Sequence, residues 1–116
     1  PTLREAVEAT DTETGPMKPM GYGINCSHPL EFAPAVEPGD WFKRIRNIRP
    51  NAAMMDKIAL CKLNHLEEGD PVELADHLGE LAQAHPHIDM WGGCCGTWDK
   101  HLGHIGKAVS RTTLER

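Results

Sequence analysis

Segments with apolar residues at helical spacing alternate along the chain with short apolar runs of strand length. Prolines and glycines separate these segments and mark the connections between them. The resulting order is helix, strand, helix, strand, helix, strand, helix, with the strands roughly 30 residues apart. This alternation predicts an α/β fold in which three parallel strands are joined by right-handed helical crossovers.

Three of the four helices are predicted from their caps. A capping box at the start of the chain predicts a first helix from Thr2 to about Thr10. A second capping box begins at Asp70 and predicts the third helix, which Pro86 ends. Thr97 is expected to cap the last helix.

The second helix and the three strands are predicted from spacing and composition. Trp41, Ile45 and Ile48 recur at helical intervals, which predicts a helix from Asp40 to about Ile48. Pro50 ends this helix, because the residue before a proline is disfavoured in the helical conformation. The strand candidates are residues 20–25, 51–55 and 88–91.

Length and charge restrict the classes of partner. A chain of 116 residues holds at most one domain, and a hydrophobic share of 40% is enough for a soluble core. The net charge of -5 argues against a nucleic-acid partner. We interpret the basic cluster at residues 43–46, with Arg49, as a solvated helix face. No apolar run reaches the roughly 20 residues of a membrane span, so no membrane partner is expected.

The cysteines and the number of strand–helix units indicate where the protein is located in the cell and whether the chain is part of a larger protein. Four cysteines without a signal peptide are typical of cytoplasmic thiols, with two structural disulfides as the alternative. Three strand–helix units cannot close a barrel, and the chain starts at Pro1 without an initiator Met. We therefore expect it to be part of a larger protein. Exposed sheet edges would then favour self-association.

Three of the cysteines stand at predicted strand ends. Cys26 ends the first strand, and the adjacent Cys94 and Cys95 follow the third. Sites in parallel α/β folds collect at such ends, so the three thiols are expected to converge. The glycines at 92, 93 and 96 permit the sharp turn that two neighbouring thiols need to reach one metal ion. Three thiolates with an open fourth position are typical of a catalytic zinc.

Other interpretations of these residues stay open. Cys61 is interpreted as a packed free thiol, but as a fourth ligand it would close a structural zinc site. The alternatives to metal binding by Cys94 and Cys95 are a vicinal disulfide between them and two unrelated buried cysteines. His28 could itself be a metal ligand, but it is interpreted as a turn residue beside Pro29 and as a hydrogen-bond donor to a ligand.

Polar residues elsewhere are interpreted more simply. Asp56 and Lys57 follow the second predicted strand, where they would either contact substrate or form a loop salt bridge. His101 and His104 lie three residues apart on the last helix and are interpreted as a solvated pair.

The chain resembles the homocysteine S-methyltransferase family in two motifs. Residues 23–29 (GINCSHP) are similar to the family's G-[IV]-N-C-x-x-P motif, and residues 92–97 (GGCCGT) are similar to its GGCCG[TS] motif. The two motif cysteines Cys26 and Cys94 are 68 residues apart and in the family's order. Residues 49–52 (RPNA) resemble the family's seventh-strand region less sharply.

The resemblance covers essentially the whole chain. It implies that residues 1–116 are the C-terminal part, from about helix 5 to helix 8, of a (β/α)8 TIM barrel domain that binds homocysteine. Its implied zinc ligands are Cys26, Cys94 and Cys95. The candidates for contact with the substrate or with the ligands are Asn25, His28 and Gly93.

The implied activity is zinc-dependent transfer of a methyl group to the thiol of homocysteine, which gives methionine. The implied partners are homocysteine, a methyl donor and Zn²⁺. A free thiol has a pKa of about 8.5 and is mostly protonated at neutral pH. Coordination to zinc removes that proton, so the resulting thiolate can attack a methyl group on a sulfonium or quaternary ammonium donor. The alternatives are a non-catalytic zinc-binding or redox thiol module, and an inactive truncated enzyme.

Overall fold

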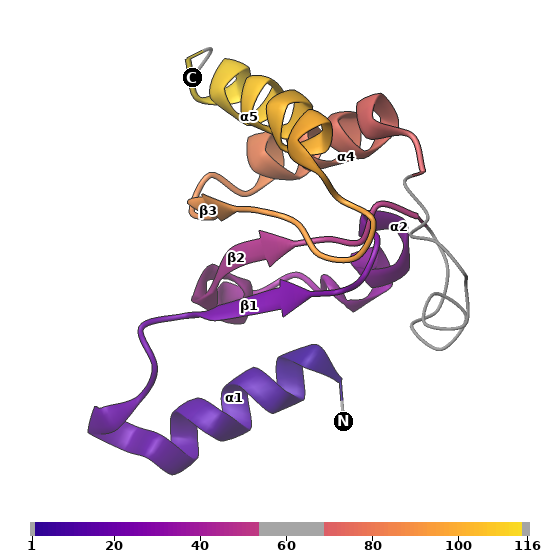
Figure 1. Cartoon of the computed structure of the whole chain (residues 1–116). Coiled ribbons are helices and arrows are strands. Elements are labelled where there is room, and N and C mark those ends of the chain that lie inside the picture. Colours follow the sequence, from indigo (N-terminus) through magenta and orange to yellow (C-terminus); the bar gives the residue numbers. More distant parts are fainter. Residues whose placement is uncertain (1, 54–68, 115–116) are drawn as a thin grey trace, which may run out of the picture.

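The computed structural model describes residues 2–53 and 69–114, and it forms an open three-stranded parallel sheet with helices (Figure 1). The strands are β1 (Tyr22–Asn25), β2 (Ile45–Arg49) and β3 (Met90–Trp91), in the spatial order β1-β2-β3. The α-helices are α1 (Leu3–Thr14), α2 (Pro29–Phe32), α4 (Pro71–Ala84) and α5 (Asp99–Leu114). Short 3₁₀ helices are η1 (Gly15–Met17), η2 (Ala33–Ala35) and η3 (Asp40–Arg44). The expected α/β class is therefore confirmed.

Helix caps account for where α1 and α4 begin. The hydroxyl of Thr2 accepts a hydrogen bond from the backbone N–H of Glu5, whose carboxylate accepts one from the N–H of Thr2. The carboxylate of Asp70 accepts hydrogen bonds from the backbone N–H groups of Val72 and Glu73. Both predicted helix starts are thus confirmed. Within the described ranges, no helix has the length and apolar character needed to cross a bilayer.

The second predicted helix and the second predicted strand are wrong. The segment predicted as one helix is η3 followed by β2, and residues 51–53 of the predicted strand lie in the loop after β2. The ladder pairs Tyr22 with Ile45 and Gly23 with Asn47, so β2 holds one extra residue at that point. A bulge of this kind puts Ile45 and Ile48 on the same side although they are three residues apart. Their spacing therefore imitated a helical period.

The core lies between one face of the sheet and the helices. Ile45 and Ile48 of β2 are fully buried, in one cluster with Val7 of α1, Leu78 of α4 and Ile105 of α5. In Figure 1, α1 lies on the β1 side of the molecule, while α4 and α5 lie together on the β3 side. The helices thus bury apolar side chains against a single face of the sheet.

The other face of the sheet is open. Gly23 and Asn25 of β1, Arg49 of β2 and Met90 of β3 are exposed, and Asn47 is half-buried. Within the described residues, β1 and β3 each pair with β2 alone. Among the described residues, the sheet therefore has one exposed face, and its two outer strands each have an edge that pairs with no further strand.

A polar cluster connects α1 to the sheet. The carboxylate of Asp11 accepts hydrogen bonds from Arg44 Nε at 2.9 Å and from the hydroxyl of Tyr22 at 2.7 Å. Arg46 of β2 forms an ion pair with Asp89, the residue before β3. The basic cluster is therefore not a solvated helix face, because two of its arginines pair with carboxylates across the fold.

Candidate metal centre

Three cysteines meet beyond the carboxyl ends of the strands. Cys26 directly follows β1, and Cys94 and Cys95 lie in the loop after β3. Their three sulfur atoms lie within 4.8 Å of one another, and all three residues are partly buried. The structure therefore brings together the three side chains that the sequence singled out.

The chain after β2 explains how cysteines from the two outer strands can meet. The backbone N–H of Cys26 donates to the carbonyl of Arg49 at 3.0 Å, and that of Cys94 donates to the carbonyl of Pro50 at 2.8 Å. The N–H of Ala52 donates to the carbonyl of Cys95 at 3.0 Å. Residues 49–52 thus lie between the two cysteine loops and hydrogen-bond to both.

Backbone conformation turns the sulfurs toward one another. Cys26 has φ of 58°, a left-handed conformation that costs a residue with a side chain on the order of 1 kcal/mol or more. The N–H of Thr97 donates to the carbonyl of Cys94 and closes a β-turn, in which Gly96 has φ of 80°. Glycine accepts this positive φ without strain, which confirms the turn expected from the glycines around the pair.

Gly93 and Thr97 fit closely inside the same loop. The hydroxyl of Thr97 donates to the carbonyl of Cys94 at 2.7 Å. A Cβ at Gly93 would stand 2.7 Å from Thr97 Cβ and nearer still to its hydroxyl oxygen. Thr97 therefore braces the cysteine turn and its hydroxyl is committed there. The expectation that it caps the last helix is wrong.

Asn51 is a site residue that the sequence reasoning missed. Its side chain is 1% exposed, and its Oδ1 accepts a hydrogen bond from the backbone N–H of Cys95 at 3.1 Å. A buried asparagine beside a cysteine loop has no local sequence signal. Its place in the RPNA stretch was the one available hint.

Cys26 and Cys94 are joined as a disulfide in this structure, with their Cα atoms 5.4 Å apart, while Cys95 keeps its thiol. Free thiols were expected at all three, so the expectation is wrong for this pair, and no vicinal disulfide forms. The two cysteines bond because their loops are both folded over the end of β2. A disulfide and a pair of thiolate ligands exclude each other, so metal binding requires the reduced form.

The reduced donor set fits a zinc ion. Cysteine thiolates bind zinc at about 2.3 Å, so two sulfurs of one tetrahedral site lie about 3.8 Å apart. Three sulfurs within 4.8 Å need little rearrangement to reach that spacing. Soft sulfur ligands also select zinc over magnesium or calcium. The group can therefore hold a metal through Cys26, Cys94 and Cys95.

The model of the family described as Homocysteine S-methyltransferase matches residues 1–109 of the 116-residue chain. The chain belongs to the homocysteine S-methyltransferase family. The resemblance seen in the two cysteine motifs is thereby confirmed. No solved structure matches the chain.

His28 of this family member lies just beyond Cys26 and begins α2. Its Nδ1 accepts a hydrogen bond from the backbone N–H of Leu30 at 3.2 Å, so a neutral ring carries its proton on Nε2. Burial lowers the pKa of the imidazole, and the neighbouring His77 ring lowers it further. His28 is thus a neutral N-cap beside the sulfur cluster, and Asn25 sits exposed at the end of β1.

Other residues singled out by sequence do not join the site. Cys61, Asp56 and Lys57 lie outside the described residues. His101 is fully buried, and its Nδ1 accepts a hydrogen bond from the backbone N–H of Trp98, whereas His104 is exposed. The interpretation of the two histidines as a solvated pair is therefore wrong for His101.

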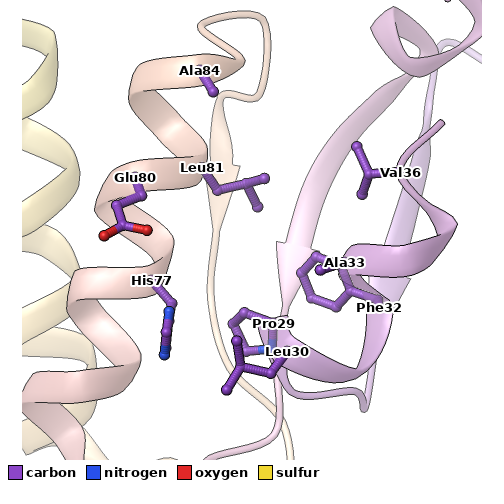
Figure 2. A pocket seen from close by; sticks show the side chains of 9 residues that line it. All are labelled: Pro29, Leu30, Phe32, Ala33, Val36, His77, Glu80, Leu81 and Ala84. Carbon is purple, nitrogen blue, oxygen red and sulfur yellow. The ribbon is translucent and has the colours of Figure 1, made fainter. Parts of the chain in front are cut away.

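A groove of about 390 Å³ runs between α2 and α4 (Figure 2). Figure 2 shows Leu81 of α4 facing Phe32 and Val36 across it, with His77 and Glu80 along one side. The walls are mainly apolar carbon, and none of the three cysteines lines them. The groove is therefore separate from the metal centre.

Proposed function

We propose that the chain carries the zinc-binding part of an enzyme that transfers a methyl group to the thiol of homocysteine and so forms methionine. The observation that carries this proposal is the convergence of three cysteine sulfurs within 4.8 Å, in a member of the homocysteine S-methyltransferase family. Three protein ligands leave one position of a tetrahedral ion for the substrate sulfur. A location in the reducing cytoplasm goes with this proposal, because the ligands must be thiolates.

The residues of the chain would hold and shape the site. Thiolates of Cys26, Cys94 and Cys95 would together outweigh the two positive charges of the ion. A bound zinc ion would supply the means to keep a substrate thiol deprotonated at neutral pH. The three cysteines are partly exposed at the strand ends, so a small thiol can reach them from solvent.

The chemistry proposed for the substrate is a direct displacement. The homocysteine sulfur forms a bond to the methyl carbon while the bond from that carbon to a sulfonium or ammonium donor breaks. The electron pair of the broken bond leaves with the donor, which becomes neutral at that atom. No general base is needed once the thiol is deprotonated, so the protein contributes mainly position.

A second candidate is a non-catalytic zinc-binding or redox thiol module. The disulfide between Cys26 and Cys94 favours it, because two thiols that bond in this fold can act as a dithiol–disulfide pair. Under this candidate, the reduced chain binds zinc or exchanges thiols but forms no methionine.

Zinc content and methionine formation, measured together, separate these functions. The reduced, zinc-loaded chain is mixed with homocysteine and a panel of sulfonium and ammonium methyl donors, and methionine is quantified. We expect one zinc per chain and methionine with at least one donor. The variants Cys26→Ser, Cys94→Ser and Cys95→Ser should bind zinc more weakly and form no methionine, whereas the control Cys61→Ser should bind zinc and form methionine as the wild type does. If the chain binds zinc but forms no methionine from any donor, the result favours the non-catalytic module. If Cys61→Ser loses zinc, the proposal of a site with three cysteine ligands and one open position is refuted.

A further inference from the structure

We propose that Asn51 is a positioning residue that holds Cys95 in place as the third sulfur ligand, an inference that rests on the proposed zinc site. In this proposal Asn51 is not itself a metal ligand. It acts through a hydrogen bond between its side-chain oxygen and the backbone of Cys95.

The peptide groups of Cys95 are fixed on both sides by the chain that follows β2. Its N–H donates to Asn51 Oδ1 at 3.1 Å, and its carbonyl accepts from the N–H of Ala52 at 3.0 Å. Asn51 is itself anchored, since its own N–H donates to the carbonyl of Ser27 at 3.3 Å. The segment therefore connects the loop after Cys26 to the loop of Cys95 through one buried residue.

Cys95 needs such a constraint more than the other two cysteines do. Side chains of adjacent residues on extended backbone point to opposite sides, so Cys94 and Cys95 reach one ion only while the turn is held. Cys94 is fixed by backbone contacts to Pro50 and Thr97, which no side-chain substitution at Asn51 removes. Within the described residues, Asn51 Oδ1 is the one side-chain acceptor of a hydrogen bond from the N–H of Cys95.

The side-chain oxygen at this position serves as a hydrogen-bond acceptor. Loss of the acceptor would leave the partly buried N–H of Cys95 unpaired and allow the turn to reorient. The remaining sulfurs of Cys26 and Cys94 would then form a two-thiolate site.

Cobalt binding reports the number of thiolate ligands independently of catalysis. The reduced full chain is titrated with Co²⁺, since thiolate-to-cobalt charge-transfer absorption grows with each sulfur bound. Zinc affinity is measured by competition with a chelator. Asn51→Ala removes the acceptor and Asn51→Asp keeps one of the same shape. Asn47→Ala is the matched control, because Asn47 is an asparagine of β2 that lies on the open face of the sheet.

We expect three-thiolate absorption from the wild type, Asn47→Ala and Asn51→Asp, and two-thiolate absorption from Asn51→Ala. Zinc affinity of Asn51→Ala should fall by about 10- to 100-fold, the usual effect of removing a hydrogen bond that orients a ligand. Three-thiolate absorption and wild-type zinc affinity in Asn51→Ala would overturn the role of Asn51.

Circular dichroism of each variant shows whether it folds. If Asn51→Ala does not fold, the decision passes to Asn51→Asp, and a folded Asn51→Asp with fewer than three thiolates overturns the proposal. A wild-type chain that binds neither cobalt nor zinc would instead refute the proposed zinc site. The two failures are therefore distinguishable.

Discussion

At the scale of single residues, the tightest steric constraint on the sulfur cluster is at Gly93. A methyl group there would meet the side chain of Thr97, which braces the turn through its hydrogen bond to the carbonyl of Cys94. Because Thr97 is held by that bond, it has no easy way to move aside. The absence of a side chain at Gly93 is thus a condition for the turn that directs two sulfurs inward.

Gly93→Ala should therefore destabilise the chain and weaken zinc binding. Overpacking of this kind costs about 1 to 3 kcal/mol, measured here as a loss of unfolding free energy in urea. The control is Gly103→Ala in α5, where an added Cβ meets no atom within 4 Å. This control should gain about 0.5 to 1 kcal/mol from helix propensity. Equal stability of the two variants would show that the loop yields freely.

Residue chemistry at the site was only partly accessible to sequence reasoning. Cys26, Cys94 and Cys95 could be grouped because strand ends and glycines are visible in the sequence. Neither the left-handed backbone of Cys26 nor the hydrogen bond that the N–H of Cys95 donates to Asn51 could be predicted. Both features depend on how the chain after β2 passes between the two cysteine loops. Tertiary structure sets this path.

At the scale of elements, the carboxylate of Asp11 adds a polar attachment between α1 and the sheet. The hydrogen bond from Arg44 holds the pKa of Asp11 below its usual range, and the hydroxyl of Tyr22 lowers this pKa further. A carboxyl group with a lowered folded-state pKa stabilises the fold above its unfolded pKa of about 3.9. That stabilisation is lost as the pH falls through the folded-state pKa.

Asp11→Asn should consequently change the pH dependence of stability. Above about pH 4 the wild type should be more stable than Asp11→Asn by a constant amount, and below it the difference should shrink. Urea unfolding of the metal-free chain between pH 7 and pH 3 measures this difference. Glu13→Gln removes the same charge from an exposed position of α1 and is the control. A difference that grows in acid would contradict the attachment described.

Helices could be predicted where capping residues mark their starts. A strand was harder to predict where its spacing depends on pairing within the sheet. The capping groups at Thr2 and Asp70 placed the starts of α1 and α4 correctly, because a cap acts within a few residues, whereas α1 ends at Thr14 and not near Thr10. β2 was assigned to a helix because its bulge spaces Ile45 and Ile48 three residues apart. A bulge is defined by the opposing strand, so it is invisible in a single segment.

At the scale of the whole molecule, the described fold is a sheet covered on one face. Helix–strand alternation was enough to predict parallel strands and the α/β class. Membership of a (β/α)8 barrel stays a prediction, because closure depends on strands other than β1, β2 and β3. The unpaired edges and open face are the surfaces that such a barrel would cover.

We expect the chain on its own to associate through these surfaces. Met90→Lys places a charge on the edge strand β3, where the side chain is 53% exposed, and should shift the population toward monomer. Leu102→Lys, at a position of α5 that is 49% exposed, is the matched control and should not. Sedimentation velocity measures both. A wild-type chain that is monomeric at all concentrations would contradict this expectation.

X-ray absorption at the zinc edge tests the central claim most directly, because it counts the sulfur atoms bound to the metal. For the reduced, zinc-loaded chain, we predict three sulfurs at about 2.3 Å and one lighter ligand. Addition of homocysteine should replace the lighter ligand by a fourth sulfur. Four sulfurs before homocysteine is added, or fewer than three, would contradict an open site formed by Cys26, Cys94 and Cys95.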